Sequence, residues 1–562
     1  MMKKNITMGL SSIILLENFT VFPEYFVGIS ILYVLIVIVL ITYSVYGLII
    51  QKALSECMAL IMFMTCYLII NDDLILLEFA SLNNSFMNDS LSYITKLIIC
   101  FFSALYFLLI SNSLKEQKLT SFEYLLIILF AILGIMIMCS CNDLLTAYLS
   151  IELSSLALYI LASYKKTSSY SIESGLKYFI TGAVSSAFFL LGSSFLYVFS
   201  GSIHFEDYIV LYESDIFFYA WADEFNPNRY TPWILTWMFI HVFGFGPIIF
   251  GPNDPFLNPF DYSFIELGLS LIMFSLFIKL ACAPFHLWSL DVYEGSPTSS
   301  SFFFAAISKL SIFVLLIRLC YISLHSTFDN TQFYCFWVGL FSVFVGSFGG
   351  IKQRRIKTLL AYSSITNMGY GLFALGTSNT LGIQMLFFHL VIYMISGLCT
   401  WSIFLFIRLK TKKNSNKYNK ELCDIALLRK SNPALAFALA LTMFSISGIP
   451  PMIGFLAKMG VFLSIVKVTF TVFAVVSAVF SVVATFYYIR IIKVIYFENL
   501  LVGKLYYPIN STVTLILSGL VFSLILLFIN PSIIYIYGYK IIPSLFEISC
   551  LPSQNYVSFW SV

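Results

Sequence analysis

The stretch LFIKLACAPFHLWSLDVYEGSP, residues 276–297, decides the fold, because it begins as a membrane span and then breaks. Lys279 lies within apolar sequence, and Pro284 interrupts the helical pattern a little over one turn later. Three titratable side chains follow at once, and they are His286, Asp291 and Glu294. A proline break frees backbone carbonyl groups, which can hold water inside a membrane. We therefore interpret the stretch as a place where water reaches a buried lysine.

The whole chain has the composition of a protein that crosses a membrane many times. Of its 562 residues, 60% are hydrophobic and 10% are charged, and the mean hydropathy is +0.92. Soluble proteins carry about 25% charged residues, so the polar surface is too small for a globule in water. The net charge is +3, and no basic run with interleaved aromatic residues predicts nucleic-acid binding. The 11 cysteines form no CxxC pair, so the sequence predicts no metal site and no cofactor site in this chain.

Apolar runs of about 20 residues predict an all-α polytopic membrane protein with about fourteen transmembrane helices. The runs lie near 26–50, 53–71, 91–110, 120–140, 143–163, 174–200, 262–286, 298–322, 332–350, 356–376, 383–407, 433–466, 468–497 and 511–530. The run over 433–466 is too long for one straight crossing and contains GIPP. We therefore expect helix 12, like helix 7, to be broken.

The loops predict the orientation. Basic loops follow the odd-numbered spans, whereas the loop between spans 2 and 3 has four acids and no Lys or Arg. The loops after odd-numbered spans therefore face the inner compartment, with Lys3 and Lys4 as the exception. The apolar segment 231–250, inside the insertion 201–261, adds either no crossing or two, because one more would invert every later loop. We interpret it as interfacial or re-entrant.

Two sets of five helices form a weak internal repeat. Spans 4–8 and spans 9–13 each have a proline break near a lysine in their fourth member. Repeats with an odd number of helices must be inverted relative to each other, and matching broken helices indicate a transport site. The predicted parts are the N-terminal transmembrane helices 1–3 (1–119), a first repeat with the insertion 201–261 (120–322), a second repeat (332–497), and a C-terminal helix and tail (498–562).

Four charged residues lie deep in the predicted spans, and they are Glu152, Lys279, Lys309 and Lys458. A charge at the bilayer centre costs about 2.5–3.5 kcal/mol on insertion scales, so such a residue pairs, faces water or functions. Each could instead be a structural ion pair or a snorkelling side chain, although Lys309 is too deep to snorkel. One acid with three lysines, two of them beside breaks, favours proton movement. Burial weakens the hold of a lysine on its proton, and a nearby glutamate restores it.

Three other ionisable residues each have two possible roles. Lys177, just inside span 6, either relays protons or snorkels. His286 either relays protons or caps the broken helix, and His389 in span 11 either links a polar chain or only packs. Lys96 and Glu266, near span ends, are expected at the membrane interface.

Several stretches resemble the antiporter-like membrane-arm family of respiratory complex I, the proton-pumping NADH:ubiquinone oxidoreductase. FHLWSLDVYEGSPTSSSFFFAAISK (285–309) is the most specific, and four others agree in order and spacing: 150–166, 175–197, 356–375 and 445–462. The resemblance covers roughly spans 4 to 13, is weak in the first 90 residues and the tail, and is absent from the insertion 201–261. The segment after span 7 and the lysine of span 12 favour the subunit 2 branch.

The resemblance implies fourteen helices with two inverted repeats and a proton path through a glutamate of span 5, lysines of spans 7 and 8, and a titratable residue of span 12. Those places are occupied by Glu152, Lys279, Lys309 and Lys458. It also implies neighbouring membrane-arm subunits, including sister antiporter-like subunits, and membrane lipids as partners. FMN, iron–sulfur clusters and ubiquinone are implied elsewhere in the complex, not in this chain.

Two other functions stay open. The first is a subunit of a multi-subunit cation/proton antiporter without redox coupling. The second is a solute transporter of unrelated fold, which the lack of a polar pocket beyond the charged residues disfavours. The aromatic-rich composition and the chain length favour a multi-pass protein of the mitochondrial inner membrane, with a plastid or bacterial membrane as the alternative.

Overall fold

The computed structural model describes residues 21–41, 47–71, 79–82, 84–117, 119, 121–208, 259–323, 328–409, 417–418, 421–426, 428–468, 470–498 and 510–546. Statements about the structure concern these residues. The expectations for Lys3, for Lys4 and for the segment 231–250 fall outside them.

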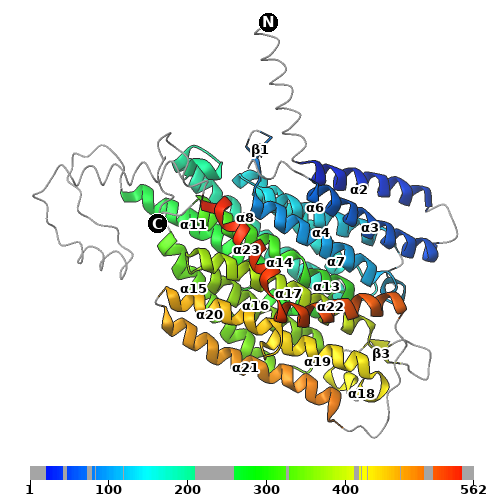
Figure 1. Cartoon of the computed structure of the whole chain (residues 1–562). Helices are drawn as coiled ribbons and strands as arrows, with labels where there is room; N and C mark the ends of the chain where they lie inside the picture. The colour runs from blue at the N-terminus through cyan, green and yellow to red at the C-terminus, as the bar shows by residue number, and fades with distance from the viewer. Residues whose placement is uncertain are drawn as a thin grey trace, which may run out of the picture.

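The described chain is a bundle of long helices that run side by side (Figure 1). The helices are α2 Phe22–Ile41, α3 Gly47–Ile70, α4 Ser90–Ile110, α5 Ser113–Glu116, α6 Glu123–Ser140, α7 Leu144–Ser163, α8 Ser169–Ser200, α11 Pro259–Leu280, α12 Leu287–Gly295, α13 Thr298–Ala306, α14 Ser308–Ile317, the π-helix η2 Arg318–Ser323, α15 Phe328–Ile351, α16 Ile356–Leu375, α17 Thr380–Phe406, the 3₁₀ helix η4 Leu422–Ile425, α18 Leu428–Ser431, α19 Pro433–Ser447, α20 Ile453–Lys467, α21 Thr471–Tyr496, α22 Ser511–Ile529 and α23 Ser532–Phe546. Two short hairpins join β1 Phe79–Ser81 to β2 Phe86–Asn88 and β3 Arg408–Leu409 to β4 Lys417–Tyr418.

The arrangement confirms a polytopic all-α membrane protein. In the described residues, eleven stretches are long and apolar enough to cross a membrane. Three more predicted spans correspond to α11, to α16 and to the α19–α20 pair. The helices form because long apolar runs carry few breakers, and polar residues define several of their ends. Asp89, for example, closes a capping box at α4, where its Oδ1 accepts a hydrogen bond from the Ser92 amide at 2.9 Å.

Both predicted breaks are present. The first begins earlier than the proline indicates, because α11 ends at Leu280 and the next residue, Ala281, has a φ of +61°. The second begins at Gly448, with a φ of +82°, between α19 and α20. A third interruption was not predicted: Ile307 separates α13 from α14, two residues before Lys309.

Two sequence expectations are wrong in detail, and one residue has a partner that was not predicted. The first span was placed over 26–50, but α2 ends at Ile41 and α3 begins at Gly47, because the sequence 26–50 contains no charged residue that would mark a boundary. The chain after 531 is not only a tail, since α23 packs against α17 and α4. Lys96, which was expected near the membrane interface, has a side chain that is only 5% exposed and forms an ion pair with Glu24.

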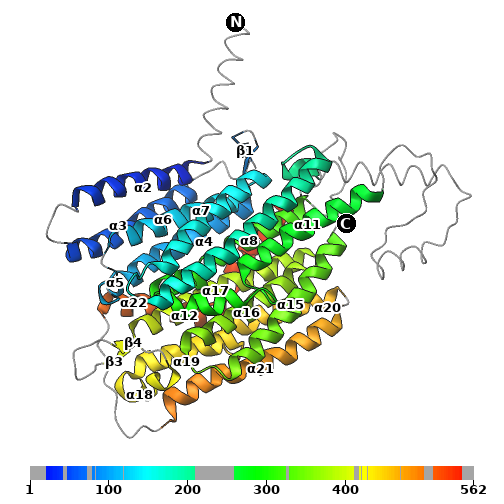
Figure 2. The ribbon, with the colours of Figure 1, turned by 180° about the vertical axis from the view of Figure 1, so that it is seen from behind.

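Close helix packing positions the lysines. At the crossing of α8 and α11, a Cβ atom on Gly192 would lie 2.5 Å from the carbonyl oxygen of Gly268, so a glycine is needed there. The helices α12 and α13 pack against α16 and α17, which joins the earlier half of the bundle to the later half (Figure 2). The helices that follow the first break therefore lie where the two halves meet, although Pro284 and Leu287 at the first break and Pro450 and Pro451 at the second are exposed.

A candidate proton path along the helix breaks

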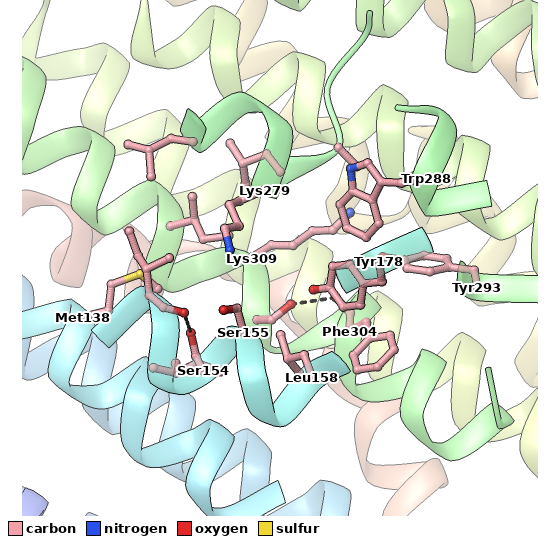
Figure 3. A pocket seen from close by; sticks show the side chains of 17 residues that line it. Met138, Ser154, Ser155, Leu158, Tyr178, Lys279, Trp288, Tyr293, Phe304 and Lys309 are labelled. Atoms are coloured by element: carbon pink, nitrogen blue, oxygen red, sulfur yellow. Dashed lines mark hydrogen bonds between the residues drawn. The ribbon is translucent and has the colours of Figure 1, made fainter. Parts of the chain in front are cut away.

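One cavity contains both Lys279 and Lys309 (Figure 3). Its volume is ≈40 Å³, counted as the space open to the centre of a water-sized sphere. A water molecule needs about 10–15 Å³ by that measure, so the cavity has room for water between the lysines. Tyr178 and Trp288 stack over its wall with ring centroids 4.7 Å apart.

Lys279 lies at the end of α11 and contacts a tyrosine of α7. Its Nζ donates a hydrogen bond to Tyr159 Oη at 3.1 Å and lies 5.7 Å from the centroid of that ring. The phenol is held in turn by an edge-to-face contact with Tyr178, with ring centroids 4.7 Å apart. A hydroxyl both donates and accepts, so Tyr159 is able to pass a proton as well as bind the ammonium.

Glu152 influences Lys279 without touching it. Its Oε1 is buried and accepts no hydrogen bond from the described residues, and no ion pair within 4.0 Å joins it to Lys279. The carboxylate nevertheless lies within electrostatic range of Lys279 and of Tyr159. The predicted attraction therefore acts across a gap rather than through a salt bridge.

Lys309 differs from the other two lysines in having no hydrogen-bond partner for its ammonium group among the described residues. Its residue is 6% exposed. Two aromatic rings face it, with centroids 6.0 Å (Tyr293, from α12) and 5.9 Å (Tyr393, from α17) from Nζ. A desolvated cation–π contact contributes about 2 kcal/mol or more, which offsets only part of the cost of burying a charge. The remaining cost favours water or the neutral amine at this position.

A second, smaller cavity of ≈10 Å³ contains Lys458 and His389. Lys458 Nζ donates to the carbonyl of Ser447 at 2.8 Å and lies 5.3 Å from the centroid of the Tyr370 ring. His389 Nε2 donates to the carbonyl of Asn367 at 3.1 Å, while its Nδ1 is buried without a partner in the described chain.

Tyr393 lines the second cavity and also faces Lys309 of the first. The structure thus brings together Lys279 and Lys309 in one cavity and Lys458 and His389 in the next. Tyr393 neighbours a residue of each cavity. The three lysines were predicted as parts of one path with Glu152, and His389 only as a possible relay, and this placement is compatible with both predictions.

The other three candidates, Glu152, Lys177 and His286, line neither cavity. Lys177 is 44% exposed on α8 and pairs with Asp291 at 2.6 Å and with Glu173 at 2.8 Å. His286 precedes α12 and makes no side-chain capping bond, and its Nδ1 is buried without a partner in the described chain. His286 was predicted either to relay protons or to cap the broken helix, and capping by its side chain is not observed.

Sequence reasoning missed several polar partners. Tyr159, Tyr293 and Tyr393 carried no signal, because aromatic residues are abundant throughout the chain. Arg318 was overlooked although it stands within the apolar run 298–322, and it forms a fully buried ion pair with Asp89. No three His, Cys, Asp or Glu residues gather as metal ligands in the described part of the chain.

Comparison with known proteins gives one consistent family. The family described as NADH:quinone oxidoreductase/Mrp antiporter, TM, matches residues 141–246 and 253–485. The chain is 32% identical over 479 residues to NADH-quinone oxidoreductase subunit N of Pelagibacter ubique, covering 85% of this chain and 89% of the relative. It is 31% identical over 454 residues to NADH-ubiquinone oxidoreductase chain 2 of Marchantia polymorpha, covering 81% and 83%.

A solved structure has a similar fold. A chain of respiratory complex I from Thermus thermophilus superposes with a TM-score of 0.68 at 23% identity, over 91% of this chain and 98% of that one. The matched residues include Glu152 and all three cavity lysines. This chain therefore belongs to the transmembrane family of the NADH:quinone oxidoreductases and Mrp antiporters.

Proposed function

We propose that this chain is the subunit 2-type member of the membrane arm of a proton-translocating NADH:quinone oxidoreductase. It moves protons through Glu152, Lys279, Lys309 and Lys458, coupled to NADH oxidation and quinone reduction elsewhere in the complex. Two inverted five-helix repeats, over 120–322 and 332–497, form the path. The names of the relatives support the complex, and the two cavities support the path.

The observation that carries the proposal is the position of Lys309. Its ammonium has no fixed partner, shares a cavity with Lys279, and faces one tyrosine from each half of the bundle. A proton that arrives on Lys309 raises the local charge and repels the proton of Lys279. Release toward Tyr393 transfers the effect to Lys458 and His389. Glu152 determines how firmly Lys279 holds its proton, because its carboxylate favours the charged form.

His286 and Lys177 fit the inner entrance of the path. Lys177 and Asp291 connect α8 to α12 at the side that the basic loops assign to the inner compartment. His286 stands at the break itself, with a free ring nitrogen. We include both as relay residues, and His389 as a relay within the second cavity.

The chain is a multi-pass membrane protein, and we assign it to the mitochondrial inner membrane. The Marchantia relative and the aromatic-rich composition support that assignment. Its partners in the proposal are the other membrane-arm subunits, including sister antiporter-like subunits, together with membrane lipids. FMN, iron–sulfur clusters and ubiquinone belong to other parts of that complex.

Purification of the native assembly separates this function from that of a cation/proton antiporter. An assembly captured through a tag on this chain should carry flavin and iron–sulfur absorbance and reduce quinone with NADH. An assembly that lacks these chromophores and exchanges sodium for protons would overturn the redox assignment.

A substitution then tests the path. Glu152→Gln removes the charge and keeps the shape, so the complex should assemble but translocate fewer protons per electron. Glu56→Gln is the matched control, because Glu56 is 51% exposed and pairs only with Lys52 on its own helix. A Glu152→Gln complex with the wild-type proton-to-electron ratio would contradict the assigned role.

A further inference from the structure

A second set of buried charges lies apart from the lysine cavities. Lys96 Nζ is 2.5 Å from Glu24 Oε1, and both side chains are 5% exposed. Arg318 Nη2 is 2.6 Å from Asp89 Oδ1, and both side chains are fully buried. We call Glu24, Lys96, Asp89 and Arg318 the outer charge centre.

The two ion pairs form one cluster. Lys96 Nζ also donates to Asn88 Oδ1 at 3.0 Å, and Asn88 directly precedes Asp89 in the chain. The thiol of Cys139 lies within electrostatic range of Lys96, Arg318 and Glu24 together. The centre contains two acids and two bases, so it is neutral when all four groups are ionised.

Several polar atoms of the centre lack partners. Arg318 Nε and Nη1 and Asp89 Oδ2 are buried and make no hydrogen bond within the described chain. Leaving a buried polar atom unpaired costs about 1–3 kcal/mol, and more for a charged group. Buried water is the usual remedy, so the unpaired atoms indicate water molecules in the centre.

The centre lies between the lysine cavity and the outer face. Glu24 begins α2, Asp89 caps α4, and Arg318 begins η2, all at helix ends that the loop charges assign to the outer side. Lys309 and Arg318 are nine residues apart, or roughly 13 Å along a helix axis. On α6, Met138 lines the cavity of Lys279 and Lys309, and its neighbour Cys139 lies beside the centre.

A purely structural clamp explains this arrangement poorly. Buried ion pairs stabilise proteins weakly, because the cost of desolvation offsets the attraction. A clamp also does not need a guanidinium with two unpaired nitrogens. A neutral, hydrated centre with two carboxylates is instead able to accept a proton and lose it again, since protonation of one carboxylate leaves a neighbouring base unbalanced.

We propose that the outer charge centre is the site from which protons of the first repeat leave toward the outer face. The inference rests on the proposed function of the lysine path. A proton released from Lys309 passes through water to Asp89 and from there to Glu24. The unbalanced charge of Lys96 or Arg318 then expels the proton outward, and the ion pair forms again.

The first test removes one pair completely. The Glu24→Leu/Lys96→Met double variant leaves no unpaired charge, so the complex should assemble and oxidise NADH. Its proton-to-electron ratio, measured in proteoliposomes, should fall to that of Lys309→Met. The matched control is Glu56→Leu/Lys52→Met, which removes an exposed pair of the same type from α3 and should keep the wild-type ratio. A wild-type ratio in the Glu24/Lys96 variant would overturn the proposal.

A second variant tests the proposal if the Glu24→Leu/Lys96→Met complex does not assemble. Arg318→Lys keeps the charge but removes the guanidinium nitrogens that hold the water. The proposal predicts a lower proton-to-electron ratio in this complex, and an unchanged ratio overturns it. Lys309→Met separates the hypothesis of the lysine path from that of the outer charge centre. If the Lys309→Met complex has the wild-type proton-to-electron ratio, the lysine path is wrong. If that ratio falls while the variants of the outer charge centre keep the wild-type ratio, only the outer charge centre is wrong.

Discussion

The two broken helices place a lysine beside the break in opposite ways. Lys279 is the penultimate residue of α11, before the first break, whereas Lys458 lies in α20, after the second. The backbone is left-handed where each break starts, with φ of +61° at Ala281 and +82° at Gly448. The two breaks therefore begin with the same backbone conformation, but the lysine precedes the first break and follows the second.

The difference lies in what binds the ammonium group. At the first break, Trp288 Nε1 donates to the carbonyl of Ile278 at 3.0 Å, and Lys279 bonds to the hydroxyl of Tyr159. At the second break, Lys458 itself donates to the carbonyl of Ser447. A hydroxyl can exchange a proton, but a carbonyl can only accept a hydrogen bond. The first break is thus suited to transfer and the second to storage.

The largest effect is expected from Gly448→Ala. A side chain at a left-handed residue costs about 1–2 kcal/mol, and the new Cβ would lie 2.8 Å from Lys458 Cδ. We expect this variant to lose most of its proton translocation, measured as protons moved per electron in purified complex. Gly519→Ala is the control, because a Cβ there meets nothing within 4 Å. Normal translocation by the Gly448 variant would show that the position of Lys458 is not critical.

A smaller, several-fold loss is expected from Tyr159→Phe. The change removes the hydroxyl partner of Lys279, and a hydrogen bond to a charged group is worth about 1.5–3 kcal/mol. Ser447→Ala sharpens the comparison, because the partner of Lys458 is a backbone carbonyl that this change keeps. Rates of proton uptake with NADH should fall for Tyr159→Phe and stay near wild type for Ser447→Ala. Equal losses would contradict the distinction between the two breaks.

Trp288→Phe should have a modest effect on stability. Phenylalanine keeps an aromatic ring against Tyr178 but loses the Nε1 donor to Ile278, a hydrogen bond worth about 0.5–1.5 kcal/mol. The temperature at which the complex dissociates on a native gel should drop slightly. No shift at all would indicate that the first break does not depend on this bond.

The smallest effect is expected from Ala281→Gly. Glycine adopts the left-handed conformation without steric cost, but it loses more conformational entropy on folding, so the net gain is at most about 1 kcal/mol. The same dissociation assay should show a small rise. A clear drop would mean that the Ala281 methyl group packs more favourably than its backbone is strained.

The buried lysines, but not their polar partners, could be predicted from the sequence. Lys279, Lys309 and Lys458 stand out because a charge in a long apolar run is rare and costly. Tyr159 and Tyr393 do not, since 35 tyrosines are spread through the chain and only the packing selects two of them.

The N-terminal polar residues were harder to interpret. Lys96 was expected at the interface because it lies near the end of a predicted span. Its partner, Glu24, was missed because it lies 72 positions away in a part of the chain where the resemblance is weak. Only the packing of α2 near α4 brings the two charges together. The third interruption, at Ile307, has no proline or glycine to mark it, so local sequence offered no signal.

The ratio of protons translocated to electrons transferred by a Lys309→Met complex tests the central claim most directly. The variant keeps the volume of the side chain and removes the ammonium between Tyr293 and Tyr393. The account predicts an assembled complex that oxidises NADH with a reduced ratio. A complex that assembles and pumps with the wild-type ratio would contradict it.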